Sequence, residues 1–335
     1  MTSTITKLCC PIALIAGVLA AAAACTAQQP ASDPTRGRRP LKVSVEPEFI
    51  VVTHADRPLL RYRYEKGPKP YFKELRTPAG VQFLLDSPPD HVHHRGLMYA
   101  VAVGGVDFWA EFENSGKQSN RECDAKIVAA GDDEDVVIRQ SVDWRSVEGK
   151  LMATERRSVR VHDGKTAAGA TMLTWRTTLE LPPGVPEAQL SGSHYFGLGL
   201  RFVRDMDKNG KFATSENDSG EVVRGAERLY SGRWCAYTAE VDGKPITVAM
   251  FDAPENPRPA TWFTMAEPFA YLSATLKLHK EPMTLKPDRP LEVCYGIAAW
   301  DGRIDAARID ETCQMWRRQL AAATAAQTQP QTPGK

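Results

Sequence analysis

The sequence predicts an all-β protein, a large antiparallel β-sandwich with one C-terminal helix. Short apolar and β-branched runs recur between turn signals, at residues 49–54, 59–65, 135–144, 171–184, 195–203 and 246–254. In the second run, Tyr62 and Tyr64 alternate with Arg61 and Arg63, which is the period of a strand with one covered face. Long helical patterns are few. This spacing favours a sandwich.

The first 25 residues predict an export signal. Lys7 supplies a weak positive region, and an apolar run from Ile12 to Ala24 leads to Cys25. The run is too short and too rich in alanine for a membrane span. "AAAAC" resembles a bacterial lipoprotein box, which predicts lipidation at Cys25. The alternative is ordinary cleavage nearby, which gives a freely soluble protein. Both place the mature chain in the periplasm or cell envelope, with membrane contact only through a lipid anchor.

The rest of the chain divides into three parts. Residues 26–40 are rich in Pro, polar and small residues and predict a flexible linker. Residues 41–320 predict a single sandwich domain, and residues 321–335 a disordered tail. The chain has 335 residues, is 42% hydrophobic and carries a net charge of +1. It has no long basic run, so a nucleic-acid partner is not expected.

One helix is expected near the end of the sandwich. Within residues 305–320, Ile309, Cys313, Trp316 and Leu320 form an apolar stripe at helical spacing, and Asp305 can cap the start.

Four cysteines follow Cys25, at positions 123, 235, 294 and 313. Their even number permits disulfides in an oxidising compartment, and the alternative is buried free thiols.

The sequence "DHVHHRG", residues 90–96, holds three of the seven histidines. If the segment is extended, His91 and His93 point to the same side, which suits two ligands of one divalent metal or two donors to one sugar, and His94 faces the other way. A metal needs further ligands. Candidates for these are His194, Glu111 and Asp107. The alternatives are a metal-free polar pocket and a structural loop. No cofactor is required by the sequence.

An aromatic step follows the histidine cluster, at Asp107, Phe108 and Trp109. Aromatic rings beside convergent polar groups are typical of sugar pockets, because a sugar ring has an apolar face and a rim of hydroxyls. The alternative for Trp109 is core packing.

Two stretches, residues 57–111 and 243–263, resemble the PmoA-like family of secreted bacterial proteins of unknown function. The family name comes from a methane monooxygenase subunit, which is an integral membrane protein. This chain has no apolar run of about 18 residues after its signal, so membrane methane oxidation is excluded. The resemblance implies a fold similar to the galactose mutarotase supersandwich, whose concave face binds sugars. That inference is an analogy of fold.

A third stretch, "SGSHYFGLGLRF", resembles the mutarotase strand that carries the catalytic acid histidine. The resemblance implies this role for His194, with Tyr195 beside it. Mutarotases also present a histidine from an earlier part of the sequence, and the resemblance implies that His91, His93 or His94 fills this role. The mutarotase base is a glutamate on a late strand, and Glu267 is the nearest candidate by order, although its flanking residues do not match the motif.

Further substrate contacts are expected from the loops. Asp252 and Arg258 supply a carboxylate and a guanidinium fork, although the nearby prolines also fit a rigid structural turn. With these two, the predicted substrate-binding residues are His94, Arg95, Asp107, Trp109, Tyr195, Asp252 and Arg258.

Together these patterns predict an exported carbohydrate-active protein. Its catalytic residues would be His194, His93, His91 and Glu267, with acid/base chemistry of the epimerase, lyase or hydrolase type on a sugar or oxidised sugar derivative. The alternative is a non-catalytic carbohydrate-binding lipoprotein. A third version adds a metal held by His91 and His93.

Overall fold

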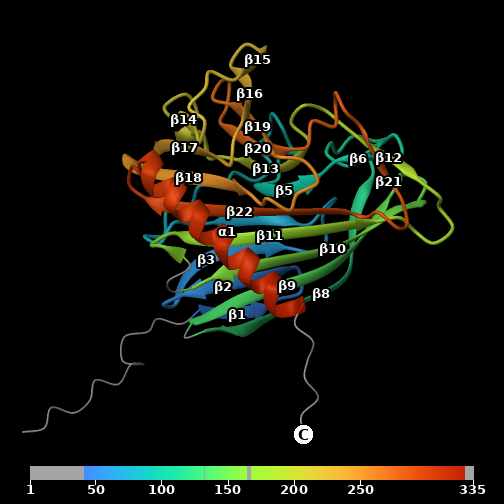
Figure 1. Cartoon of the computed structure of the whole chain (residues 1–335), viewed down its shortest axis with the longest axis horizontal. Coiled ribbons are helices and arrows are strands. Elements are labelled where there is room, and N and C mark those ends of the chain that lie inside the picture. The colour runs from blue at the N-terminus through green and yellow to red at the C-terminus, as the bar shows by residue number, and fades with distance from the viewer. Residues whose placement is uncertain (1–40, 132, 164–166, 329–335) are drawn as a thin grey trace, which may run out of the picture. The chain divides into compact units, whose positions relative to one another are not determined.

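The computed structural model describes residues 41–131, 133–163 and 167–328, which form antiparallel sheets and the helix α1 (Figure 1). The largest sheet has ten strands, in the spatial order β1 (Leu41–Val45), β2 (Phe49–His54), β3 (Arg57–Arg63), β4 (Tyr71–Leu75), β5 (Leu97–Ala100), β13 (Gly197–Arg201), β20 (Tyr271–Thr275), β19 (Thr261–Met265), β16 (Glu227–Ser231) and β15 (Glu221–Arg224).

A second sheet has eight strands, in the order β14 (Lys211–Thr214), β17 (Trp234–Val241), β18 (Lys244–Asp252), β22 (Leu291–Asp301), β11 (Thr171–Glu180), β10 (Leu151–His162), β9 (Asp133–Arg145) and β8 (Lys117–Ala130). A small sheet pairs β21 (Met283–Leu285), β12 (Ala188–Ser191), β6 (Ala102–Val103) and β7 (Val106–Asp107). A 3-10 turn, η2, covers Arg204–Met206. Every predicted strand run coincides with a strand, so the all-β prediction is confirmed.

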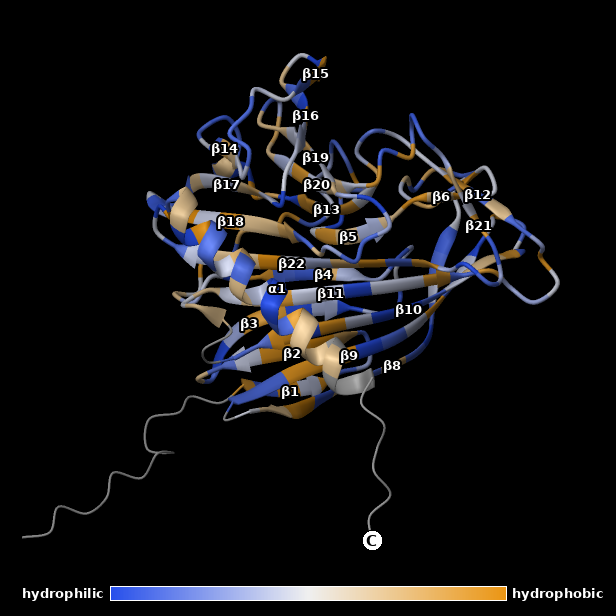
Figure 2. Ribbon diagram, viewed as in Figure 1, coloured by the Kyte–Doolittle hydropathy of each residue, from blue (hydrophilic) through white to orange (hydrophobic). Residues whose placement is uncertain are grey.

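The two large sheets enclose a common apolar core. Hydrophobic residues occur along strands of both large sheets (Figure 2), and buried and partly exposed residues alternate along most of β10, which places one set of its side chains in the interior. The Phe72 ring from the ten-stranded sheet lies 4.8 Å from the ring of Tyr62 and 6.0 Å from that of Trp175 in the eight-stranded sheet. Phe72 is fully buried, and such burial contributes about 2 kcal/mol to stability.

Helix α1 (Ala306–Thr328) packs on the opposite face of the eight-stranded sheet (Figure 1). The Asp305 carboxylate accepts a hydrogen bond from the backbone N–H of Arg308 at 2.8 Å, which is the predicted cap. The four residues of the predicted apolar stripe are buried. The indole N–H of Trp316 donates to the Thr174 hydroxyl at 2.8 Å and fixes the helix to β11.

The helix extends past the predicted domain end at residue 320, through Thr328. The prediction of a disordered tail was therefore wrong for residues 321–328. The physical reason is that residues 321–326 are alanines apart from Thr324, and alanine has the highest helix propensity. Residues 329–335 lie outside the described part of the chain, as do the predicted signal, Cys25 and the linker.

The cysteines of the described residues are Cys123, Cys235, Cys294 and Cys313, and all are free thiols. The disulfide alternative is not supported. Burial raises the pKa of the Cys294 and Cys123 thiols to about 12, which keeps them protonated and unreactive. In the described part of the chain, we find no helix with both the length and the apolar character that crossing a membrane requires.

Candidate functional site

An open cleft of about 550 Å³ lies over β19 and β20. Met265 pairs with Tyr271 in the register of these strands, and both side chains line the cleft. The other lining residues include apolar and aromatic side chains together with imidazoles and charged groups. They are Trp109, Tyr195, Phe263, Pro268 and Phe269, and His91, His93, His94, Arg224, Gly225, Ala226, Glu227 and Glu267.

The histidine segment forms consecutive turns, so the geometry expected for an extended segment does not apply. The His94 N–H donates to the carbonyl of His91 at 2.9 Å, and the Ser87 N–H donates to the carbonyl of His94 at 2.8 Å. The turns bring all three imidazoles together. The ring centroids of His91 and His94 lie 4.6 Å apart and are stacked, and those of His93 and His94 lie 4.8 Å apart.

Glycine ends this segment for a steric reason. Gly96 has φ +43°, and a Cβ there would lie 2.1 Å from the backbone oxygen of Phe72. A side chain at this position would push the segment away from β4, and with it the three imidazoles.

His94 is the buried member of the histidine cluster. Only 4% of it is exposed, and its ring lies 5.1 Å from Phe269 and 5.5 Å from Tyr271. Burial, together with the neighbouring imidazoles, lowers the pKa of His94 to about 2, so the ring is neutral at pH 7. Its Nδ1 has no hydrogen-bond partner in the described structure.

His93 and His91 are more exposed than His94. Burial and the nearby Lys69 ammonium lower the pKa of His93, so its imidazole is neutral at pH 7 and can accept a proton. The Nδ1 of His91 lies 3.1 Å from a carboxylate oxygen of Asp90.

Trp109 is held from behind by polar groups. The Asp107 carboxylate accepts hydrogen bonds from the N–H of Trp109 at 2.6 Å and of Ala110 at 3.1 Å. The Lys69 ammonium donates to the Trp109 carbonyl at 2.5 Å. The indole stacks on Phe196, with centroids 5.5 Å apart. Trp109 is 5% exposed, so its indole is packed in the core while it also lines the cleft.

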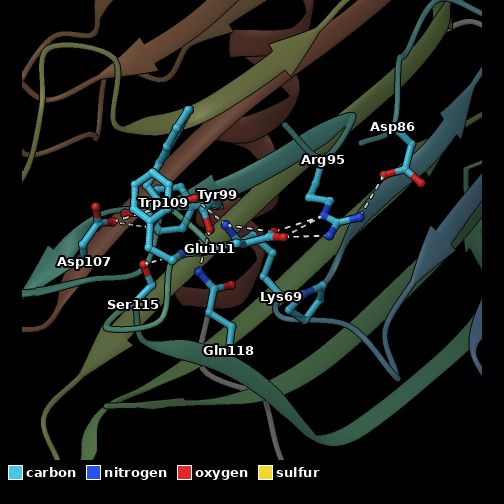
Figure 3. A network of polar contacts seen from close by, with 12 residues as sticks. Lys69, Asp86, Arg95, Tyr99, Asp107, Trp109, Glu111, Ser115 and Gln118 are labelled. Atoms are coloured by element: carbon cyan, nitrogen blue, oxygen red, sulfur yellow. Dashed lines mark hydrogen bonds and ion pairs between the residues drawn. The ribbon is translucent and has the colours of Figure 1, made fainter. Parts of the chain in front are cut away.

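Glu111 lies between Arg95 and Lys69 in this network (Figure 3). Its carboxylate accepts two hydrogen bonds from Arg95, Nε to Oε1 at 3.0 Å and Nη2 to Oε2 at 2.6 Å. The Lys69 side chain is 1% exposed, and burial lowers its pKa to about 8 despite the Glu111 carboxylate. Arg95 and Asp107 do not line the cleft, and both support residues next to it.

His194 lies beside the cleft, in the segment before β13. Its Nε2 is 3.2 Å from Oε2 of Glu227, and its Nδ1 is 3.3 Å from the Ser193 hydroxyl. Glu227 lines the cleft and also accepts a hydrogen bond from Arg224 at 2.6 Å. A Glu227 carboxylate held in this way fixes the orientation of the imidazole.

Ring contacts connect the two groups of histidines. The centroid distances are 5.0 Å from His93 to Trp109, 4.7 Å from Trp109 to Tyr195 and 5.0 Å from Tyr195 to His194. His91, His93 and His94 line the cleft, whereas His194 does not line it and reaches it through its contacts with Tyr195 and Glu227.

The predicted carboxylates fall in different places. Glu267 is exposed and lines the cleft. Two residues later, the ring centroid of Phe269 lies 4.8 Å from that of His91. Asp252 does not line the cleft. Its buried carboxylate accepts a hydrogen bond from the Asn256 side chain at 2.7 Å, and burial raises its pKa. Its backbone oxygen accepts from Arg317 of α1.

Arg258 is also absent from the lining of the cleft. Its guanidinium donates to the carbonyls of Leu276 at 3.1 Å and Glu281 at 2.6 Å. Asp252 and Arg258 thus lie outside the cleft, and their hydrogen bonds fit the rigid-turn alternative, because both side chains hold backbone or neighbouring side-chain groups.

Several cleft residues were not predicted, above all Glu227, Phe263 and Tyr271. Glu227 belongs to a hairpin whose sequence has no distinctive motif. For Tyr271 a signal existed in the alternating glycines of β13. A Cβ at Gly199 would lie 2.0 Å from the Tyr271 hydroxyl, so only glycine leaves room for this ring.

The predicted metal ligands are not assembled in the part of the chain that the structure describes, where no group of three or more His, Cys, Asp and Glu side chains could hold a metal ion. The ligands that would have to join His91 and His93 are engaged elsewhere. Asp107 accepts backbone N–H groups, Glu111 binds Arg95, and His194 contacts Glu227.

The structure defines an all-β sandwich protein with an open, partly aromatic cleft. The chain belongs to a family of unknown function, DUF6807, whose model matches residues 50–314. That family description does not include the PmoA-like name. No curated protein sequence matches the chain.

Solved structures with a similar arrangement include two α-galactosidases. GH36 alpha-galactosidase AgaA from Geobacillus stearothermophilus is 7% identical, with a TM-score of 0.46, and the match covers 78% of this chain and 40% of that one. AgaB from the same organism is 7% identical, with a TM-score of 0.48 and coverages of 78% and 41%. The chain thus spans about two fifths of their length. Similarity at this level says nothing about activity.

Proposed function

We propose that this protein binds a carbohydrate in the cleft and acts on it by acid/base chemistry. The observation that carries the proposal is the composition of the cleft, in which aromatic rings adjoin imidazoles and the two carboxylates of Glu227 and Glu267. Aromatic side chains stack on the apolar face of a sugar ring, and polar groups around them bind its hydroxyls. The mutarotase-like relationship suggested by the sequence is part of the proposal.

The roles follow from the surroundings of each group. His194, oriented by Glu227, is the proton donor to a ring oxygen or leaving group. His93 has a lowered pKa and is suited to accept a hydrogen bond or a proton. Glu267 is exposed at the cleft and is the candidate base. A donor and an acceptor around one sugar can serve epimerisation, β-elimination or hydrolysis.

The alternative is a carbohydrate-binding protein without catalysis, which uses the same cleft. The bordering carboxylates favour the acid/base version, because a binding module needs no proton acceptor beside an imidazole. Metal-assisted chemistry is not part of the proposal, since its predicted ligands are engaged elsewhere.

The test is a screen of the purified protein against sugars, keto-sugars and their glycosides, followed for both binding and turnover. We expect His93→Ala and His194→Ala to lower turnover of any active substrate by about a hundredfold or more, the size of a general acid or base contribution. His54→Ala is the matched control, since His54 lies on β2 and does not line the cleft.

The carboxylate variants separate the two versions. Glu267→Gln and Glu227→Gln should retain binding and lose turnover. Binding by the parent without turnover of any bound sugar would identify a binding protein. Parent-like behaviour of both histidine variants on every bound sugar would show that the cleft is not the site.

Export and lipidation at Cys25 remain proposals, supported by the signal-like sequence. Cys25→Ala, expressed in a bacterial host, should move the protein from the membrane fraction to the soluble periplasmic fraction. An unchanged distribution would contradict lipidation.

A further inference from the structure

A second hollow of about 270 Å³ lies over β16 and β19. Its lining is mainly polar, and we call it the polar hollow. The residues that define it are Asp218, Glu221, Tyr230, Ser231, Thr261 and Lys277.

The polar hollow continues the cleft along the same strands. On β16, Glu227 lines the cleft, whereas Leu229 and Ser231 line the polar hollow. On β19, Phe263 lines the cleft and Thr261 the polar hollow. The register pairs Leu229 with Phe263 and Ser231 with Thr261. Alternate residues of a strand share a face, and two residues advance about 7 Å, so the two spaces lie consecutively on one face of the sheet.

The turn after β20 borders the polar hollow and contacts His194. Lys277 lines the polar hollow, and two residues later the His279 ring lies 5.9 Å from that of His194. The backbone N–H groups of Lys280 and Glu281 both donate to the Lys277 carbonyl. The Lys280 ammonium binds the Glu221 carboxylate at 2.6 Å, which connects the turn to β15. The turn therefore brings the floor of the polar hollow next to the His194 side of the cleft.

The backbone around the polar hollow is held in a conformation that side chains disfavour. Lys277 has φ +53°, and Asn217, just before Asp218, has φ +50°. Asparagine tolerates this left-handed conformation, whereas lysine adopts it uncommonly, so the unfavourable position is Lys277. Such residues concentrate at ligand sites. Among the described residues, neither the Lys277 ammonium nor the Ser231 hydroxyl has a protein partner for a hydrogen bond, so both are available to a ligand.

We propose that the polar hollow is a second sugar subsite, and that the ligand is an oligosaccharide with one unit in the cleft and a linked unit in the polar hollow. This inference rests on the proposed function. The cleft supplies aromatic rings for one unit, and the polar hollow supplies the ammonium of Lys277 and the hydroxyls of Ser231 and Thr261 for the next.

Calorimetric titration of the full chain with glucose, galactose and mannose and with their di- and trisaccharides tests the proposal. In at least one series, we expect the disaccharide to bind about tenfold more tightly than the monosaccharide. Lys277→Gly should abolish this gain and leave monosaccharide binding unchanged. Glycine suits φ +53°, so this variant should fold at least as well as the parent.

Lys66→Gly is the matched control, because Lys66 also has a left-handed backbone, at φ +54°, and lines neither space. The Lys66→Gly variant should still bind the disaccharide more tightly than the monosaccharide by the same factor as the parent. Trp109→Ala should weaken both mono- and disaccharides, since it acts in the cleft.

The outcomes separate the two proposals. If no sugar of any length binds, the proposed function fails. If monosaccharides bind and disaccharides bind no more tightly, or if Lys277→Gly keeps the gain, the second subsite is overturned and the proposed function stands.

Discussion

The buried ion pair between the sheets and the histidine cluster at the cleft are both polar, but their partners differ. Arg157 and Glu155 have side chains that are 1% and 0% exposed. The guanidinium donates twice to Glu155 at 2.8 Å, and also to Tyr62, Gln118 and the carbonyl of Pro70. Glu155 further accepts hydrogen bonds from Trp144 and Thr177. This group is fully satisfied by the protein itself.

The cleft contains a buried group without such a partner. The Nδ1 atom of His94 has no hydrogen-bond partner in the described structure, and burial lowers the pKa of this imidazole. Buried polar groups are normally hydrogen-bonded. The comparison teaches that the ion pair is satisfied within the fold, whereas the unsatisfied imidazole beside the cleft costs stability.

The largest expected effect is on the ion pair. Glu155→Gln leaves the buried Arg157 charge without its counter-ion and should lower the free energy of unfolding by about 3–5 kcal/mol. Urea denaturation measures this. The control is Glu180→Gln, whose partner Arg156 is exposed, and it should change the free energy by less than about 1 kcal/mol. Equal effects of the two variants would refute the contrast.

The histidine cluster should make the protein sensitive to acid. An unfolded His94 binds a proton below about pH 6.5, whereas the folded one stays neutral down to about pH 2. Below pH 6.5 the unfolded state therefore binds more protons than the folded state. The stability that neutral His94 contributes is fully present above pH 6.5 and is lost as the pH falls. The expected slope is about 1.4 kcal/mol per pH unit between pH 6 and pH 4.

The measurement is urea denaturation at a series of pH values. His94→Gln should reduce the slope by that amount relative to the parent. His54→Gln, at a histidine with an exposed ring, should leave the slope unchanged. A parent and His94→Gln protein with the same slope would contradict burial of a neutral imidazole at this position.

The smallest expected effect concerns the support of Trp109. Asp107→Ala removes the acceptor for two backbone N–H groups and should lower the free energy of unfolding by about 1 kcal/mol. It should also broaden the tryptophan emission spectrum. Asp107→Asn, which keeps an acceptor oxygen, should recover most of both properties. Failure of Asp107→Asn to differ from Asp107→Ala would assign the effect to charge.

The sequence predicted the fold better than the site. Strand periodicity is a local property, and Tyr62 and Trp316 are buried on the faces that their spacing indicated. The histidines and Trp109 were found because their residue types are unusual in one short segment. Glu227 was missed because its role comes from a contact with His194 at 3.2 Å, made across strands that are not consecutive in the chain.

Asp252 and Arg258 were predicted from their residue types, yet neither lines the cleft. Their residue types suit sugar binding, but the sequence does not reveal which backbone carbonyls and side chains stand nearby. Their hydrogen bonds to Asn256 and to the Leu276 carbonyl depend on where the loops cross, which residue pattern alone does not determine.

Gly199 gives the molecule one simple means of changing its selectivity. Because the Tyr271 hydroxyl occupies the space where a Cβ would stand, one added methyl group would lift the phenol ring and make the floor of the binding space shallower. No charged or proton-carrying group would change. A substitution at position 199 would thus change the size of ligand that fits the cleft, while the imidazoles and carboxylates stay the same.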